Sequence, residues 1–100
     1  MPRGVLVVRS APADPARTAE FDAWYSEHLA EVLAIPGVLA ARRYRTLDPE
    51  PSYLAVYDLE AEDLTAPIKA LRSADAPSRA RMPEVVRMDP PPEATLYELL

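Results

Sequence analysis

A chain of 100 residues, 49% hydrophobic and 27% charged, has the length and composition of one globular domain and not those of a disordered protein. Sixteen acidic and eleven basic residues give a formal net charge of −5, and no stretch concentrates the bases, which argues against binding to nucleic acid or to an anionic membrane. The absence of cysteine excludes disulfides, thiolate metal sites and cysteine nucleophiles, and no apolar run is long enough for a membrane span or a signal-peptide core. We therefore expect a cytoplasmic protein.

The first third of the chain predicts a strand followed by a long amphipathic helix. Residues 5–8 form a short β-branched apolar run, typical of an interior strand. Asp14 is placed to cap a helix, and Pro15 suits its first turn. From there to residue 35 the apolar side chains recur with helical periodicity and gather on one face. These residues are Phe21, Trp24, Tyr25, His28, Leu29, Val32 and Ile35.

The next segment predicts a β-hairpin. Pro36 and Gly37 end the helix, and two strands over 38–47 and 52–59 are separated by a short proline-rich connection. In each strand, successive side chains point alternately to the two faces of the sheet. One face of the first strand carries Val38, Ala40, Arg42, Tyr44 and Thr46. In the second strand Tyr53, Ala55, Tyr57 and Leu59 share one face, and Leu54 and Val56 lie on the other.

The remaining segment predicts an irregular second helix that begins over residues 60–63 and ends at Pro83. A short strand over 85–88, an extended proline linker and a final strand over 95–100 complete the chain. The order β-α-β-β-α-β, with a split or extended last strand, predicts an α+β, ferredoxin-like single domain over residues 1–100, with an antiparallel sheet and two helices on one face. Because the other face is also apolar, we expect a second copy to cover it in a homodimer.

Five segments resemble small dimeric α+β-barrel proteins related to the EthD-like group. They are Phe21-Asp22-Ala23-Trp24-Tyr25, Glu27-His28, Leu33-Ala34-Ile35-Pro36-Gly37, Ala41-Arg42-Arg43-Tyr44-Arg45 and Tyr53-Leu54-Ala55-Val56-Tyr57-Asp58-Leu59. The resemblance implies a barrel formed by two sheets around an internal pocket, in a superfamily that includes cofactor-free monooxygenases, muconolactone-type isomerases and aromatic polyketide cyclases. It covers residues 20 to 60 best.

The chain departs from the family pattern in two places. Ala30 stands where the family often has proline, two residues after the helix histidine. The segment 73–80 lacks the aromatic residue and the tryptophan that often precede the Arg-Met pair, here Arg81-Met82. These differences change one wall of the implied pocket, so the substrate does not follow from the resemblance.

His28 is the first candidate for chemistry because a histidine on an apolar helix face can stay neutral and accept a proton. The alternative is a core histidine whose ring is hydrogen-bonded to its neighbours. Tyr44, Tyr53 and Tyr57 are the other catalytic candidates, since a tyrosine offers an apolar wall and a hydroxyl that can orient a substrate oxygen. The alternative for each is packing at the dimer interface.

Trp24, Arg42, Leu54 and Val56 are the candidate substrate-binding residues. Arg42 shares a strand face with Tyr44 and could bind a carboxylate, although pairing with acidic side chains at the rim is favoured for the arginines of this strand. The glutamates of the first helix, Glu20, Glu27 and Glu31, are expected to be solvated surface charges. No ligand pattern for a metal and no phosphate-binding loop is present, so no cofactor is expected.

These residues together predict a small cofactor-independent enzyme. It would act by proton transfer, in a cyclisation, isomerisation or elimination, on a hydrophobic carbonyl-bearing or aromatic molecule such as a polyketide or lactone. The alternative is a non-catalytic homodimer that binds a small hydrophobic ligand.

Overall fold

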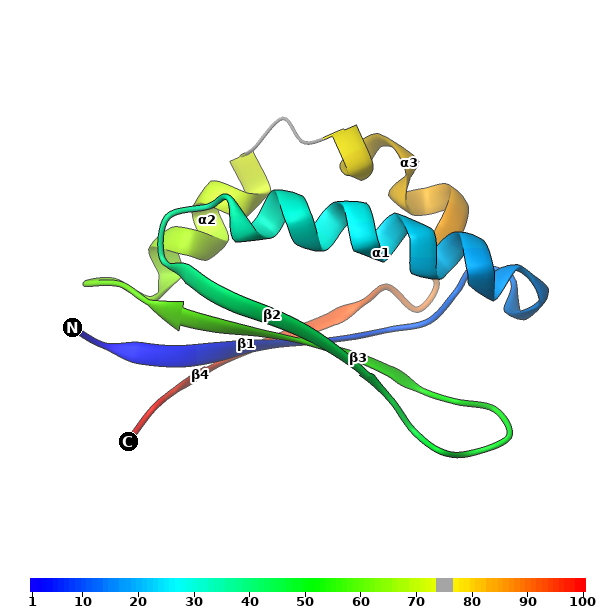
Figure 1. The fold of residues 1–100 in the computed structure, drawn as a ribbon, viewed down its shortest axis with the longest axis horizontal. Coiled ribbons are helices and arrows are strands. Elements are labelled where there is room, and N and C mark those ends of the chain that lie inside the picture. The colour runs from blue at the N-terminus through cyan, green and yellow to red at the C-terminus, as the bar shows by residue number, and fades with distance from the viewer. Residues whose placement is uncertain (74–76) are drawn as a thin grey trace.

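The computed structural model describes residues 1–73 and 77–100. Its strands form one four-stranded antiparallel sheet, and the helices lie over this sheet (Figure 1). Strands β1 (Arg3–Ser10) and β3 (Tyr53–Glu60) lie in the middle, with β2 (Val38–Arg45) beside β3 and β4 (Glu93–Glu98) beside β1. All three neighbouring pairs are antiparallel. The order β2-β3-β1-β4 is that of a ferredoxin-like domain, so the predicted α+β fold class is confirmed.

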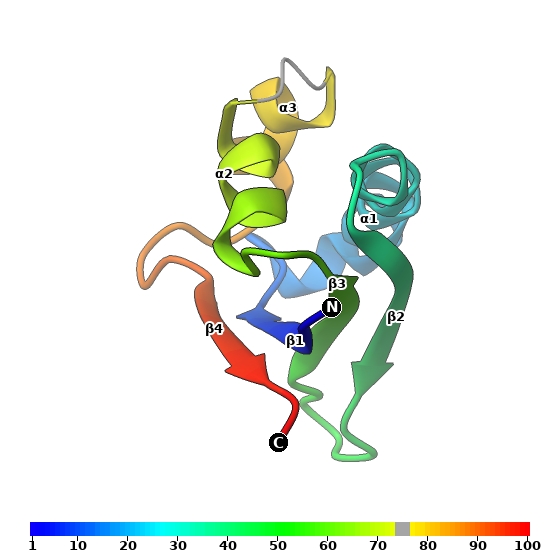
Figure 2. The ribbon, with the colours of Figure 1, turned by 90° about the vertical axis from the view of Figure 1, so that its left-hand side faces the viewer.

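Three α-helices pack on one face of this sheet (Figure 2). They are α1 (Thr18–Leu33), α2 (Thr65–Ser73) and α3 (Pro77–Val85). A 3-10 turn, η1 (Pro15–Arg17), precedes α1. Asp14 caps this turn, because its carboxylate accepts a hydrogen bond from the backbone amide of Ala16 at 2.9 Å. The predicted cap is confirmed, although the single long helix expected from there to residue 35 is a short turn followed by α1.

The segment after β3 differs from the prediction. α2 begins at Thr65 instead of at residues 60–63, because residue 60 still belongs to β3. A separate helix, α3, begins at Pro77; residues 74–76, which the predicted second helix also spanned, lie outside the described residues. Pro83 does not end α3 but lies inside it, since its missing amide removes only one bond and the amide of Val86 still donates to the Met82 carbonyl at 2.8 Å.

The short strand predicted over residues 85–88 is absent from the described structure. Val85 ends α3, and Val86 makes only an isolated bridge to Pro12. Val86 is nonetheless 1% exposed and belongs to the hydrophobic core. The apolar pair therefore packs the end of α3 against the hydrophobic core. A short apolar run without alternation does not distinguish this role from that of a strand.

A register shift at the start of β2 changes one predicted side-chain direction. The pairing of β2 with β3 is irregular between Val38 and Ala40. As a result Val38 packs against the core together with Ala41, whereas strict alternation would have placed it with Ala40 on the opposite face. The turn before β2 uses Gly37 at φ 95°, a left-handed conformation in which glycine has no steric cost.

The core lies between α1 and the helix-facing side of the sheet. Every second residue of β3 is buried there, which confirms the predicted alternation of this strand. The buried side chains of α1 and β3 that form this core are Phe21, Trp24, Tyr25, Val32, Tyr53, Ala55, Tyr57 and Leu59.

The opposite side of the sheet, called here the outer face, carries no helix within residues 1–73 and 77–100 (Figure 2). The strand register arranges its side chains in rows across the four strands. The row at the hairpin end is Tyr44, Leu54, Arg9 and Glu93, and the middle row is Arg42, Val56, Val7 and Thr95. The third row is Ala40, Asp58, Val5 and Tyr97. None of the described helices is long and apolar enough to cross a lipid bilayer.

Candidate functional site

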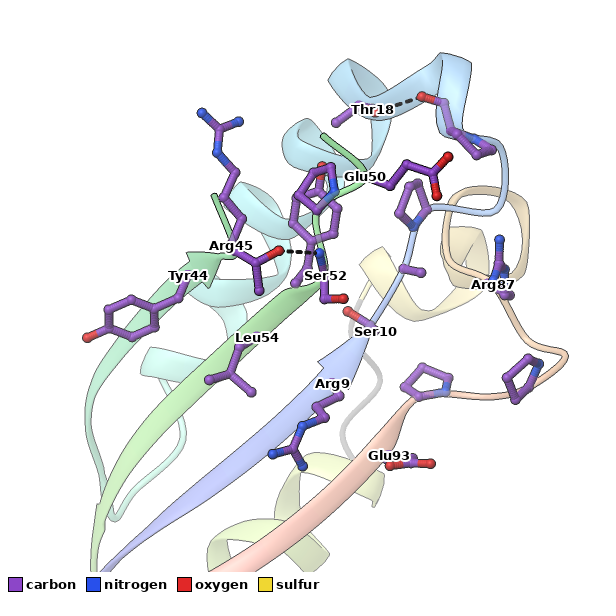
Figure 3. A pocket seen from close by; sticks show the side chains of 18 of the residues that line it. Arg9, Ser10, Thr18, Tyr44, Arg45, Glu50, Ser52, Leu54, Arg87 and Glu93 are labelled. Carbon is purple, nitrogen blue, oxygen red and sulfur yellow. Dashed lines mark hydrogen bonds between the residues drawn. The ribbon is translucent and has the colours of Figure 1, made fainter. Parts of the chain in front are cut away.

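A cavity of about 990 Å³ opens where the hairpin end of the sheet meets the start of β4 (Figure 3). Its walls come from residues 9–12 at the end of β1, residues 44–46 and 49–54 of the hairpin, and residues 90–93 before and within β4. Pro15, Thr18 and Arg87 complete the lining. We call this the end cavity. Its volume lies at the upper end of the range typical of small-molecule sites.

The walls of the end cavity combine rigid apolar surface with a few polar groups. Seven prolines from three segments line it, together with two tyrosine side chains and Leu54. Proline has no backbone donor and a fixed φ, so these segments offer apolar surface of defined shape without exposing further amides. Ser10 contributes a hydroxyl, which lies 2.6 Å from the hydroxyl of Tyr25 on α1. The cavity is therefore suited to a small molecule with a hydrophobic body and a polar end.

The structure brings three of the predicted site residues to the end cavity. Tyr44, Tyr53 and Leu54 all line it. Tyr44 and Leu54 share a row of the outer face, whereas Tyr53 is 9% exposed and belongs to the helix-facing side. The cavity thus takes residues from both sides of the sheet at the point where the sheet ends.

The other predicted residues lie elsewhere. Arg42 and Val56 occupy the middle row of the outer face, outside the cavity lining. Arg42 forms a bidentate pair with Asp58, at 2.9 and 3.1 Å, and donates to the Tyr44 hydroxyl at 3.1 Å. This is the favoured alternative for the arginine, a pair with an acidic side chain, and it leaves the guanidinium occupied.

His28 and Trp24 lie in the layer between α1 and α3, also outside the cavity lining. Their rings are stacked, with centroids 4.6 Å apart and planes at 12°. Trp24 donates its indole N–H to the Ser78 carbonyl at 2.7 Å, and His28 Nδ1 lies 3.2 Å from the Ser78 hydroxyl. Ser78 itself is fully buried near the start of α3.

Glu31 completes this group and corrects the prediction that it is a surface charge. Its carboxylate accepts from the Ser78 backbone amide at 3.2 Å and from the Ser78 hydroxyl. It therefore satisfies a free amide in the first turn of α3 and joins α1 to α3. Glu27 also bonds across to α3, to Arg81. Side-chain periodicity within α1 could not reveal either contact because α3 was not predicted as a separate helix.

The hydrogen bonds of Ser78 define the proton position on His28. The Ser78 hydroxyl has one proton, which it donates to Glu31, so it can only accept from His28. We therefore assign the proton of the neutral imidazole to Nδ1, which leaves the lone pair on Nε2. Burial lowers the pKa of His28, with a smaller lowering from Arg79 and an opposing effect of Glu31. Both observations describe a histidine that is neutral near pH 7.

This lowered pKa predicts a pH dependence of stability. Below the ordinary histidine pKa of about 6.5, the unfolded chain takes up a proton that folded His28 resists. The free energy of unfolding should therefore fall as the pH drops from about 6.5 toward the lowered pKa of the folded state. Urea unfolding at closely spaced pH values between about 7.5 and 5.5 measures this.

His28 is the only histidine in the chain, so the control is direct. His28→Asn keeps an amide donor near the position of Nδ1 but cannot titrate. We expect the variant to lose the stability change in this pH interval, and an unchanged slope would show that another group causes it.

A second polar group lies between α1 and the sheet. Arg43 places its guanidinium 4.4 Å from the centre of the Tyr25 ring and pairs with Asp22 at 3.0 Å. Burial raises the pKa of Tyr57, with a further contribution from Tyr25 and an opposing one from Arg43. Burial likewise raises the pKa of Tyr25. Tyr57 is thus a neutral, 2% exposed phenol outside the cavity lining, so a catalytic role for it stays a prediction.

Sequence reasoning missed the residues that give the end cavity its polar character. Ser10, Arg9 and Arg87 line it, and none was predicted as a site residue. The first two end a strand and the third follows α3, positions without periodicity. The proline-rich connections on three sides are the available signal, but in the sequence alone they indicate only breaks between elements. Among the described residues no group of three or more histidine, cysteine, aspartate or glutamate side chains could hold a metal ion.

Solved structures with the same architecture include small bacterial proteins of similar length. SnoaB from Streptomyces nogalater, described as a cofactor-independent oxygenase, superposes with a TM-score of 0.79 at 16% identity, over 100% of this chain and 95% of that one. A putative antibiotic biosynthesis monooxygenase from Bordetella bronchiseptica has a TM-score of 0.74 at 18% identity, covering 100% and 99% of the two chains. Rv0793 from Mycobacterium tuberculosis has a TM-score of 0.70 at 17% identity, covering 98% and 95%.

The sequence matches no protein-family model and no curated protein. At identities below one fifth, likeness to these structures establishes the fold and leaves the reaction open. The predicted relationship to the EthD-like group stays a prediction. The comparisons and the strand order together show that this chain has the ferredoxin-like α+β fold of the antibiotic biosynthesis monooxygenase structures.

Proposed function

We propose that this chain is a small cofactor-independent enzyme that binds a hydrophobic carbonyl-bearing or aromatic molecule in the end cavity and transfers a proton on it. The observation that carries the proposal is the cavity itself: about 990 Å³, walled by Tyr44, Tyr53, Leu54 and prolines, with the Ser10 hydroxyl in its lining. Apolar walls hold the body of such a molecule, and the hydroxyls orient its oxygen.

The proposed reaction begins with removal of a proton from a carbon beside a carbonyl. The electron pair of the broken C–H bond moves onto the carbonyl oxygen and gives an enolate, which a hydroxyl donor stabilises. Return of the proton to another carbon completes an isomerisation, attack on a second carbonyl closes a ring, and loss of a leaving group completes an elimination. An enolate also reacts with O₂, so the same first step would serve cofactor-independent oxygenation, the activity by which SnoaB is described.

His28 is the proposed proton acceptor, with the tyrosines as hydroxyl donors. Its neutral ring with a lone pair on Nε2 has the protonation state that a base requires. It lies outside the cavity lining, while the Tyr25 ring, 6.0 Å from the His28 ring, connects to the lining through its bond to Ser10. A role for His28 therefore requires that the bound molecule reach past Ser10 and Tyr25 toward the layer between α1 and α3.

We also propose that two copies pair through their outer faces. Val5, Val7 and Val56 lie on this face, and Tyr44 and Tyr97 are each about half exposed there, at 51% and 50%. Contiguous exposed apolar and aromatic side chains of this kind are typical of a protein–protein interface. Because the end cavity includes the outer row of Tyr44, Leu54 and Arg9, a second copy would close its open side.

Solvent deuterium exchange tests the catalytic proposal without knowledge of the product. A panel of aromatic ketones and lactones is incubated with the protein in D₂O, and the loss of C–H signals is followed by NMR. We expect at least one compound to exchange faster with the protein than in buffer, and His28→Asn to lower that rate by about a hundredfold or more. Tyr53→Phe should lower it about tenfold, since it removes one hydrogen bond to the enolate oxygen.

Ser26→Ala provides the matched control, because Ser26 lies on the exposed side of α1 and its hydroxyl donates to the Asp22 carbonyl. It should exchange at the rate of the unchanged protein. Equal exchange by His28→Asn would remove His28 from the mechanism and leave the cavity as the site. Absence of exchange for every compound that binds would contradict the enzyme proposal.

The alternative is a non-catalytic homodimer that binds a small hydrophobic ligand. The observation in its favour is that His28 is stacked on Trp24 and bonded to Ser78, the arrangement of a core histidine. It predicts ligand binding in the end cavity with no exchange at all, so the same experiment separates the two functions.

A further inference from the structure

We infer that the molecule bound in the end cavity is an anion, an aromatic or other hydrophobic small molecule that carries a carboxylate or a phenolate. The inference rests on the proposed function in taking the end cavity as the binding site. It adds the chemical class of the ligand, which neither the fold nor the resemblance contains.

The first observation is the distribution of arginines without ion pairs. Five of the seven arginines outside the cavity pair with carboxylates, namely Arg3, Arg17, Arg42, Arg43 and Arg81. Of the other two, Arg79 donates to the backbone carbonyls of Leu71 and Arg72, and Arg72 lies on α2. Three that line the end cavity, Arg9, Arg45 and Arg87, have guanidinium groups that make no hydrogen bond or ion pair within residues 1–73 and 77–100. Because the chain has more carboxylates than basic groups, three guanidiniums without a carboxylate partner in one cavity are unexpected.

The second observation is how these arginines are placed. Arg9 lies on the outer side of β1, Arg45 ends β2 and Arg87 follows α3, so three separate segments bring them to one cavity. Figure 3 shows the three side chains arranged around Ser10. A planar guanidinium with several N–H donors matches the two oxygens of a carboxylate. Aromatic walls beside these donors favour a ligand whose anion is attached to an apolar ring.

Two carboxylates also line the cavity, and their positions matter for the charge balance. Glu50 belongs to the hairpin loop, and Glu93 lies opposite Arg9 in the pairing of β1 with β4. Neither forms an ion pair with the cavity arginines within the described chain. With three arginines and two glutamates, the lining has a formal charge of +1 in a protein whose total is −5. The lining of the end cavity thus has a charge of opposite sign to that of the whole chain.

Isothermal titration calorimetry with a matched pair of probes tests the inference. 2-Naphthoate carries the anion, and 2-naphthalenemethanol has the same ring system with a neutral hydroxyl. We expect 2-naphthoate to bind at least about tenfold more tightly than 2-naphthalenemethanol. Its affinity should fall as the salt concentration is raised. Arg45→Gln and Arg87→Gln should each weaken 2-naphthoate binding about tenfold and leave the neutral probe unaffected.

Arg72→Gln is the matched control, since Arg72 is likewise exposed and its guanidinium has no ion pair among the described residues, but it lies on α2, outside the cavity lining. It should leave both affinities unchanged. Equal binding of the two probes, insensitive to Arg45→Gln and Arg87→Gln, would overturn the anion inference while still supporting a hydrophobic site. Failure of both probes to bind at millimolar concentration would contradict the end cavity as the binding site, and with it the proposed function. Tight 2-naphthoate binding together with no deuterium exchange would overturn only the catalytic proposal.

Discussion

Phe21→Ala is expected to lower the free energy of unfolding by about 4 kcal/mol, a large part of the 5–15 kcal/mol typical of a domain. Phe21 is 0% exposed. Its ring meets those of Tyr25 and Tyr53 edge to face, each with centroids 5.1 Å apart, and Arg43 lies 5.3 Å from its centre. Truncation would leave a cavity between α1 and β3 that these large rings cannot close. Urea unfolding followed by circular dichroism measures the change.

Leu33→Ala is the control for this substitution. Leu33 is the last residue of α1 and is 45% exposed, so its truncation should cost less than about 1 kcal/mol. A loss of less than about 1.5 kcal/mol for Phe21→Ala would mean that the layer between α1 and the sheet is not packed as described.

Val7→Asp is expected to separate the proposed dimer into folded monomers. Val7 lies in the middle row of the outer face, between Val56 and Thr95. In the dimer an aspartate there would be a buried charge without a partner, which costs about 3–5 kcal/mol and weakens association by roughly 10²- to 10⁴-fold. In a single chain the same side chain faces water, so the fold should persist. Sedimentation equilibrium at micromolar concentration should give twice the chain mass before the change and one chain mass after it.

Ala66→Asp is the control, an aspartate introduced at an exposed position in the first turn of α2, away from the outer face. It should sediment as the unchanged protein does. If the unchanged chain is a folded monomer at these concentrations, the pairing through the outer face is wrong and the end cavity functions with its side open to solvent.

Much of the fold follows from local patterns in the sequence. The two-residue alternation of β3 and the short connection before it predict a hairpin with one buried face, and both are confirmed. Where patterns were ambiguous, the prediction was wrong. Val85 and Val86, an apolar pair without alternation, favour a strand in the sequence. In the structure Val85 is the last residue of α3, and Val86 follows it. The irregular pairing that turns Val38 toward the core leaves no local signal, because it depends on the register with β3.

The candidate site was predictable only in part, for a similar reason. Which tyrosines share a face of β3 follows from alternation, but which face Tyr44 joins depends on the hairpin register, and Tyr44 pairs with Leu54 on the outer side. The histidine and the tyrosines were therefore expected in one pocket, whereas only Tyr44 and Tyr53 reach the end cavity. Its arginines come from chain segments far apart in sequence, and their meeting is a property of the tertiary structure alone.

The most direct test of the end cavity as the binding site is amide chemical-shift mapping by NMR during titration with 2-naphthoate. We predict that the largest shift changes fall on the amides of Ser10, Arg45, Tyr53 and Arg87, which lie on separate segments around the cavity. The contrary result is that the amide shift changes fall on His28 and Ser78, where α1 contacts α3, and not on the cavity residues. That result would contradict this account and place the ligand elsewhere.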